Sequence, residues 1–195
     1  MASWLTVFTG PMFAGKTEAL IHAVKRARKA ELPVQVFAPA SDTRNGVGVI
    51  KSHGGIDIES LDVTVWAVGS AATVGLCDRV RDSTRVVAID EAQFFDPSIV
   101  GQVKLLQQRD LLIYVAGLDC DYKQDPFGPM PQLLALADDV RKLNAICSGC
   151  KGLDGRLTYR SVVSTEQVLL GAAEAYAPMC RACYSLTQRT RSSRA

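Results

Sequence analysis

The segment from Trp4 to Thr17 constrains the fold of this chain more than any other stretch. It begins with an apolar run, Trp4 to Thr9, that is rich in residues favouring strands. Gly10 starts a loop of the pattern Gly-x-x-x-x-Gly-Lys-[Ser/Thr], and residues with helical spacing follow. A strand, a glycine-rich loop and a helix in this order predict a phosphate-binding loop rather than a chance glycine turn. The sequence therefore predicts binding of a nucleoside triphosphate.

The residues of this loop have distinct chemical roles. Gly10 and Gly15 allow the backbone to curl so that its amides face phosphate oxygens, at the positive end of the following helix. Lys16 is predicted to reach the β- and γ-phosphates, and the Thr17 hydroxyl to bind magnesium. The predicted ATP-binding loop consists of Gly10, Pro11, Met12, Phe13, Ala14, Gly15, Lys16 and Thr17.

The rest of the first 146 residues alternates apolar runs with amphipathic stretches. A strand, a helix and a strand within the first 40 residues indicate a parallel βαβ unit. The pattern predicts an α/β fold with a parallel sheet, the core of a RecA-like phosphate-loop NTPase. The expected helices are residues 17–30, 71–81, 99–108 and 133–137, and the expected strands are residues 4–9, 34–38, 63–68, 86–89, 111–116 and 140–146.

An acidic pair follows one of the buried strands. The apolar run of residues 86–89 leads directly into Asp90 and Glu91. In a parallel sheet, the carboxyl end of this strand faces the same crevice as the glycine loop. Asp90 is therefore predicted to bind magnesium, and Glu91 to point toward the group that attacks the γ-phosphate.

Two loops carry side chains that can do chemistry. Residues 41–56 are rich in glycine and include Asp42, Arg44 and His53. A loop of this length is either functional or an ordinary surface loop, and the sequence leaves both readings open. Residues 120–129 include Tyr122 and Phe127, which either anchor the loop by burial or form a wall of the substrate site.

Four of the six cysteines form two Cys-x-x-Cys pairs, Cys147/Cys150 and Cys180/Cys183. In a reducing compartment this spacing indicates zinc far more often than disulfides. Four thiolates leave no open position for water, so the predicted zinc site is structural. Residues 147–195 are expected to form a small zinc-binding domain with a substrate-covering lasso and a basic tail. Cys77 and Cys120 are interpreted as ordinary thiols.

The composition limits the other functions. The chain has 195 residues, of which 48% are hydrophobic, enough for one α/β domain and a small addition. A formal net charge of +2 does not favour a nucleic-acid or membrane partner. No apolar run reaches the length of a membrane span, and no signal-peptide pattern begins the chain, so a cytoplasmic protein is expected.

Two reactions fit these parts. If water attacks the phosphate, the protein is a small phosphate-loop NTPase or nucleotide-binding regulator, whose zinc segment grips a macromolecular partner. If an alcohol attacks, a compact kinase with a lid that excludes water suffices. A helicase is disfavoured because 195 residues leave no room for a second domain of similar size.

The chain also resembles the thymidine kinases of the human cytosolic type (type II) from Leu5 to about Tyr184. The matching motifs are Gly-Pro-Met-Phe-Ala-Gly-Lys-Thr, Asp-Thr-Arg from Asp42, Ile-Asp-Glu-Ala-Gln-Phe-Phe from Ile89, Gly-Leu-Asp-x-x-Tyr with Pro-Phe-Gly from Gly117, and Glu-x-Tyr-x-x-x-Cys-Arg-x-Cys from Glu174. Together these motifs are highly specific, although each alone is weak.

This resemblance implies transfer of the ATP γ-phosphate to the 5′-hydroxyl of thymidine or deoxyuridine. Glu91 and Lys16 would be catalytic, with Glu91 accepting the hydroxyl proton. Asp90, Glu91, Ala92 and Gln93 would join the ATP site. The implied nucleoside-binding residues are Met12, Phe94, Leu118, Tyr122, Phe127, Thr158, Gln167, Val168, Leu169, Leu170, Gly171 and Tyr176. A homotetramer with feedback inhibition by dTTP is usual in this family.

Three residues depart from the family pattern. Ala14 replaces the usual serine of the phosphate loop, where backbone amides do the binding. Ala172 stands where a second glycine often follows Gly171, and it is expected to stiffen the lid or change its fit. Tyr122 replaces a common phenylalanine and adds a hydroxyl near the nucleoside.

Overall fold

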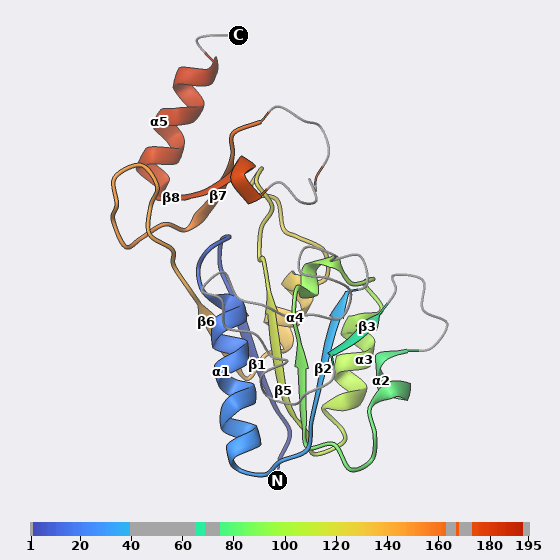
Figure 1. Cartoon of the computed structure of the whole chain (residues 1–195). Coiled ribbons are helices and arrows are strands. Elements are labelled where there is room, and N and C mark those ends of the chain that lie inside the picture. Colours follow the sequence, from blue (N-terminus) through green and yellow to red (C-terminus); the bar gives the residue numbers. More distant parts are fainter. Residues whose placement is uncertain (1, 40–64, 69–74, 163–166, 168–172, 193–195) are drawn as a thin grey trace.

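A parallel sheet forms the centre of the molecule (Figure 1). The computed structural model describes residues 2–39, 65–68, 75–162, 167 and 173–192. Within these ranges the sheet has six strands in the order β3-β2-β4-β5-β1-β6, and all of its pairings are parallel. The strands are β1 Trp4–Thr9, β2 Val34–Pro39, β3 Val65–Val68, β4 Val86–Ile89, β5 Leu112–Gly117 and β6 Asp139–Lys142. The predicted α/β class is confirmed.

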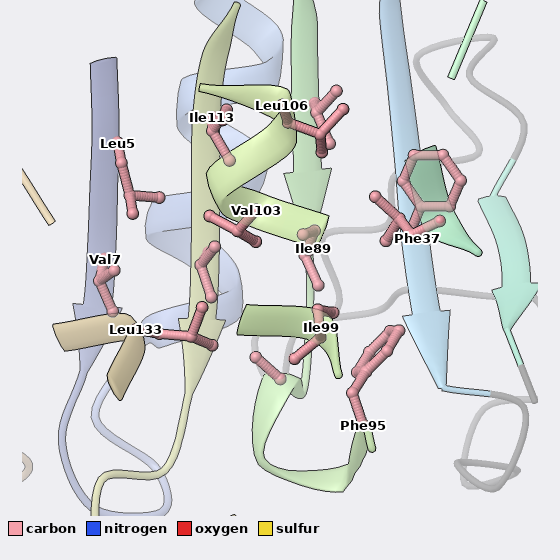
Figure 2. Packing of buried hydrophobic residues seen from close by; sticks show 14 of the residues in the cluster. Leu5, Val7, Phe37, Ile89, Phe95, Ile99, Val103, Leu106, Ile113 and Leu133 are labelled. Atoms are coloured by element: carbon pink, nitrogen blue, oxygen red, sulfur yellow. The ribbon is translucent and has the colours of Figure 1, made fainter. Parts of the chain in front are cut away.

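Helices cover both faces of this sheet, because successive side chains of a buried strand point to opposite sides. Leu5 and Val7 of β1 face a core that includes Ile99 and Val103 of helix α3 (Figure 2). Phe8, the residue after Val7, faces the other side of the sheet and packs in a second hydrophobic cluster. The first face is covered by α2 (Leu76–Arg79), α3 (Ile99–Leu106) and α4 (Met130–Leu136).

Helix α1 (Lys16–Lys29) covers the second face. Its buried side chains Leu20, Ile21, Val24 and Ala27 recur at helical spacing and form the apolar stripe of an amphipathic helix. Full burial of each large aliphatic side chain contributes about 1.5–3 kcal/mol. This packing holds the start of α1, and hence the preceding glycine loop, at the carboxyl end of β1.

Several boundaries differ from the expected ones. The strand expected at residues 140–146 is β6, which ends at Lys142. Leu143 adds one more hydrogen bond to Thr9, after which Ala145 pairs with Gly155 instead. Helix α4 starts three residues earlier than expected, at Met130, with Pro131 in its first turn. Helix α2 ends at Arg79, two residues earlier than expected, and Val80 is extended. The first expected residues of α2 and β3 lie outside the described residues.

The C-terminal region, which carries the two Cys-x-x-Cys pairs, lies beyond the carboxyl ends of the central strands, and α5 is at its far end (Figure 1). Strands β7 (Leu157–Arg160) and β8 (Tyr176–Met179) pair antiparallel, and the short helix η3 (Ala173–Ala175) precedes β8. Helix α5 (Arg181–Ser192) starts between the last two cysteines. Among the described residues, no helix is both long and apolar enough to cross a membrane.

Candidate active site

The glycine loop curls between β1 and the start of α1. Gly10 has a φ of 134°, and a Cβ atom there would overlap the carbonyl oxygen of Leu143, so only glycine fits. The Lys16 ammonium group donates to the carbonyl oxygen of Pro11 at 2.6 Å. The loop thus brings a cation and the first amides of a 14-residue helix to one place, as anion binding requires.

The buried carboxylate of Asp90 faces this loop from the end of β4. The Thr17 hydroxyl donates to its two oxygens at 3.2 and 3.4 Å, although the residues are 73 positions apart. Burial raises the pKa of Asp90 to about 7, and the negative charge of Glu91 adds to this effect. A hydroxyl and a carboxylate in contact are hard oxygen ligands of the kind that magnesium binds.

Glu91 has an unusual backbone conformation. Its φ of 51° and ψ of 43° lie in the left-handed region, which costs a residue with a side chain about 1–2 kcal/mol. The Glu91 amide donates to the Asp90 carboxylate at 3.0 Å, and the Gln93 side-chain amide donates to the Glu91 carboxylate. Residues held in this conformation cluster at functional sites, and no sequence pattern here indicates it.

An aromatic wall stands beside the acidic pair. The rings of Phe94 and Phe127 meet edge to face, with centroids 5.6 Å apart. The Leu118 amide donates to the side-chain oxygen of Gln93 at 2.9 Å. The structure therefore brings together the end of β5, the following loop and the segment after β4, and Phe127 of that loop is only 7% exposed.

Tyr122 of the same loop is held by the C-terminal region. The guanidinium carbon of Arg160 lies 3.4 Å from its ring centroid, and the Tyr184 hydroxyl donates to its carbonyl oxygen at 3.0 Å. Sequence reasoning missed Arg160 and Tyr184. The alternation of β7 offered a signal for Arg160, because Thr158 and Arg160 share the buried face of this strand.

The hairpin β7–β8 also contacts the glycine loop. The Met12 amide donates to the Thr158 hydroxyl at 3.1 Å, so this amide is turned toward the hairpin. The Gln167 side chain donates to the buried carboxylate of Asp121 at 3.0 Å. Tyr176 pairs with Arg160 across the ribbon. Of the other expected positions, Val168, Leu169, Leu170, Gly171, Ala172, Asp42, Arg44 and His53 lie outside the described residues.

The four paired cysteines form one cluster that can hold a metal ion. Their sulfur atoms lie within 4.8 Å of one another, and those of Cys150 and Cys180 are 3.8 Å apart. Tetrahedral ligands about 2.3 Å from zinc have roughly this separation. Hydrogen bonds from the amides of Cys150 and Cys180 lower the pKa of Cys147 to about 6, whereas contacts with neighbouring thiols, that of Cys180 first, raise the pKa of Cys183 to about 12.

Known proteins resemble the chain along most of its length. The family model described as thymidine kinase matches residues 3–184. A thymidine kinase of Bacteroides thetaiotaomicron is 43% identical over 180 residues, which cover 92% of this chain and 86% of that protein. Thymidine kinases of two Bacteroides fragilis strains show the same identity and coverage.

Proposed function

Because the chain belongs to the thymidine kinase family, we propose that it transfers the γ-phosphoryl group of ATP to the 5′-hydroxyl of thymidine, and also of deoxyuridine. The observation that carries this proposal is the contact between Thr17 of the glycine loop and the buried Asp90, with Glu91 next in the chain. A phosphate-loop NTPase core of the RecA-like type is part of the same proposal.

ATP binding is assigned to the glycine loop and the acidic segment. The amides at the start of α1 and the Lys16 ammonium group would bind the β- and γ-phosphates. Thr17 and Asp90 would hold magnesium, which supplies neutralisation of the phosphate charge when it is bound. A positive ion beside Asp90 would also favour the ionised carboxylate and oppose the effect of burial.

Glu91 is assigned the role of general base. Its carboxylate would take the proton from the 5′-hydroxyl while the oxygen of that hydroxyl bonds to the γ-phosphorus. The bond from this phosphorus to the bridging oxygen breaks, and ADP leaves with both electrons of that bond. Lys16 would stabilise the charge that spreads over the transferred group.

The nucleoside would bind between the aromatic wall and the hairpin. Apolar surface for a flat base would come from Phe94, Leu118, Tyr122 and Phe127. The contact between the Phe94 and Phe127 rings and the contact of Arg160 with the Tyr122 ring support this assignment. Thr158, Gln167, Tyr176, Met12 and residues 168–171 complete the proposed pocket. Backbone amides of a loop can read the edge of thymine without a dedicated side chain.

We assign zinc to the four cysteines as a structural ion. All four ligands are thiolates, so the site offers no position for a substrate. The ion would fix the base of the hairpin that carries Thr158. On the family resemblance alone, we also propose a cytoplasmic homotetramer that dTTP inhibits and that has no nucleic-acid or membrane partner.

An assay with purified protein, ATP and magnesium tests this function. We expect equal amounts of ADP and thymidine 5′-monophosphate when thymidine is present, and almost no ADP without it. ADP formation at the same rate without any nucleoside would instead favour a phosphate-loop NTPase. Deoxyuridine in place of thymidine tests the second substrate in the same format.

A further inference from the structure

On the basis of the kinase function proposed above, we propose that Gln93 is a positioning residue that fixes the carboxylate of Glu91 for proton abstraction. Gln93 lies in the short helix η2 (Ala92–Phe94) that follows the acidic pair, and its relative exposure is only 3%. A buried side-chain amide must find hydrogen-bond partners, and those of Gln93 are the Leu118 amide after β5 and the Glu91 carboxylate after β4.

The partners of Gln93 determine which way its amide faces. The backbone amide of Leu118 is a donor and lies 2.9 Å from the side-chain oxygen of Gln93. The nitrogen of the same side chain must therefore face the other way, where it donates to one carboxylate oxygen of Glu91. Gln93 thus connects the end of β5 to the proposed base.

The surrounding backbone leaves Gln93 little room to move. A Cβ atom at Gly128, whose φ is 51°, would overlap the main-chain carbonyl oxygen of Gln93. A Cβ atom at Gly117 would lie 2.9 Å from its side-chain oxygen and 2.6 Å from the sulfur of Met130. Two glycines therefore let neighbouring segments close around this residue, which favours a single side-chain conformation.

A neutral donor suits this position on chemical grounds. Glu91 follows the acidic Asp90. A positively charged side chain paired with Glu91 would compete with the substrate proton for the carboxylate. An amide can hold one carboxylate oxygen without adding charge, and this contact sets the direction in which the other oxygen faces. Since misplacement of a reacting group by about 1 Å can cost roughly 100-fold in rate, such a contact matters for turnover.

The family resemblance places Gln93 in the ATP site, and kinetics separates the two roles. We expect Gln93→Met to lower kcat roughly 10- to 100-fold while the KM values for ATP and thymidine change less than about threefold. Gln93→Glu keeps an acceptor for the Leu118 amide but loses the donor, so it should lower kcat to a similar extent. A rise in KM for ATP at unchanged kcat, or full activity of Gln93→Glu, would overturn the proposal.

The decisive measurement repeats Gln93→Met in a Glu91→Gln background. If Gln93 acts through Glu91, its loss should change the residual kcat of Glu91→Gln by less than about twofold. An equal loss of kcat in both backgrounds would mean a merely structural role and would overturn the proposal. Wild-type turnover in Glu91→Gln itself would refute the base assignment, a distinguishable failure of the proposed mechanism.

Gln35 provides a matched control. Its buried side chain donates to the carbonyl oxygen of Arg79 and accepts from the Arg81 amide and the Thr84 hydroxyl, at the opposite end of the sheet from the acidic pair. Gln35→Met should lower the unfolding temperature but leave kcat unchanged. A loss of kcat in this control as large as that in Gln93→Met would show that any buried amide has the effect, and it would overturn the proposal.

Discussion

Replacing Thr158 by valine tests how the hairpin supports the glycine loop. The side chain is 5% exposed, and its hydroxyl accepts the Met12 amide at 3.1 Å across 146 positions of sequence. Valine has nearly the same shape but leaves this amide without that acceptor. Because the hydrogen bond is only partly buried, we expect a loss of about 1–2 kcal/mol in the free energy of unfolding.

Part of this energy should appear in ATP binding, because the same contact orders the loop that would hold the phosphates. The dissociation constant for ATP should rise several-fold, up to roughly the tenfold that corresponds to about 1.4 kcal/mol. It is measured by titration calorimetry without nucleoside, so that a lost contact between Thr158 and thymine cannot contribute.

The control is Thr84→Val, which removes an equally buried hydroxyl that donates to Gln35 at 2.6 Å, away from the loop. Urea unfolding should show that both variants are destabilised, whereas only Thr158→Val should weaken ATP binding. Equal stability losses with unchanged ATP affinity in Thr158→Val would refute the coupling between the hairpin and the loop.

Two further changes test the C-terminal region. Cys180→Ser should release the metal and raise KM for thymidine more than KM for ATP, whereas metal content that stays at one ion per chain would disprove the ligand set. Tyr184→Phe removes the hydroxyl that donates to Tyr122, so it should reduce stability by about 0.5–1.5 kcal/mol and raise KM for thymidine. An unchanged KM for thymidine would show that Tyr184 does not support the proposed nucleoside pocket.

Local spacing explains which parts of the fold could be predicted. The glycine loop, the alternation of strands with helices and the cysteine pairs are all short patterns, and each one lies where the sequence indicated. The contact between Thr17 and Asp90 also follows from topology. The strands before these residues both neighbour β5, so their carboxyl ends meet at one edge of the sheet.

Long-range contacts explain what could not be predicted. The left-handed backbone of Glu91 could not be predicted, because residues other than glycine rarely adopt this conformation and the glutamate itself gives no sign of it. The bond from Met12 to Thr158 and the ring contact between Arg160 and Tyr122 join segments far apart in sequence. The end of β6 was misjudged because apolar residues continue to Ile146, whereas Ala145 leaves the sheet to pair with Gly155.

A single-turnover experiment on Glu91→Gln tests the central claim most directly, that this residue takes the proton from the acceptor hydroxyl. Glutamine keeps the shape of the side chain but cannot accept that proton as a carboxylate does. With ATP and thymidine bound, we predict that phosphoryl transfer slows about 100-fold or more while ATP binds with unchanged affinity. Transfer at the wild-type rate would contradict the mechanism.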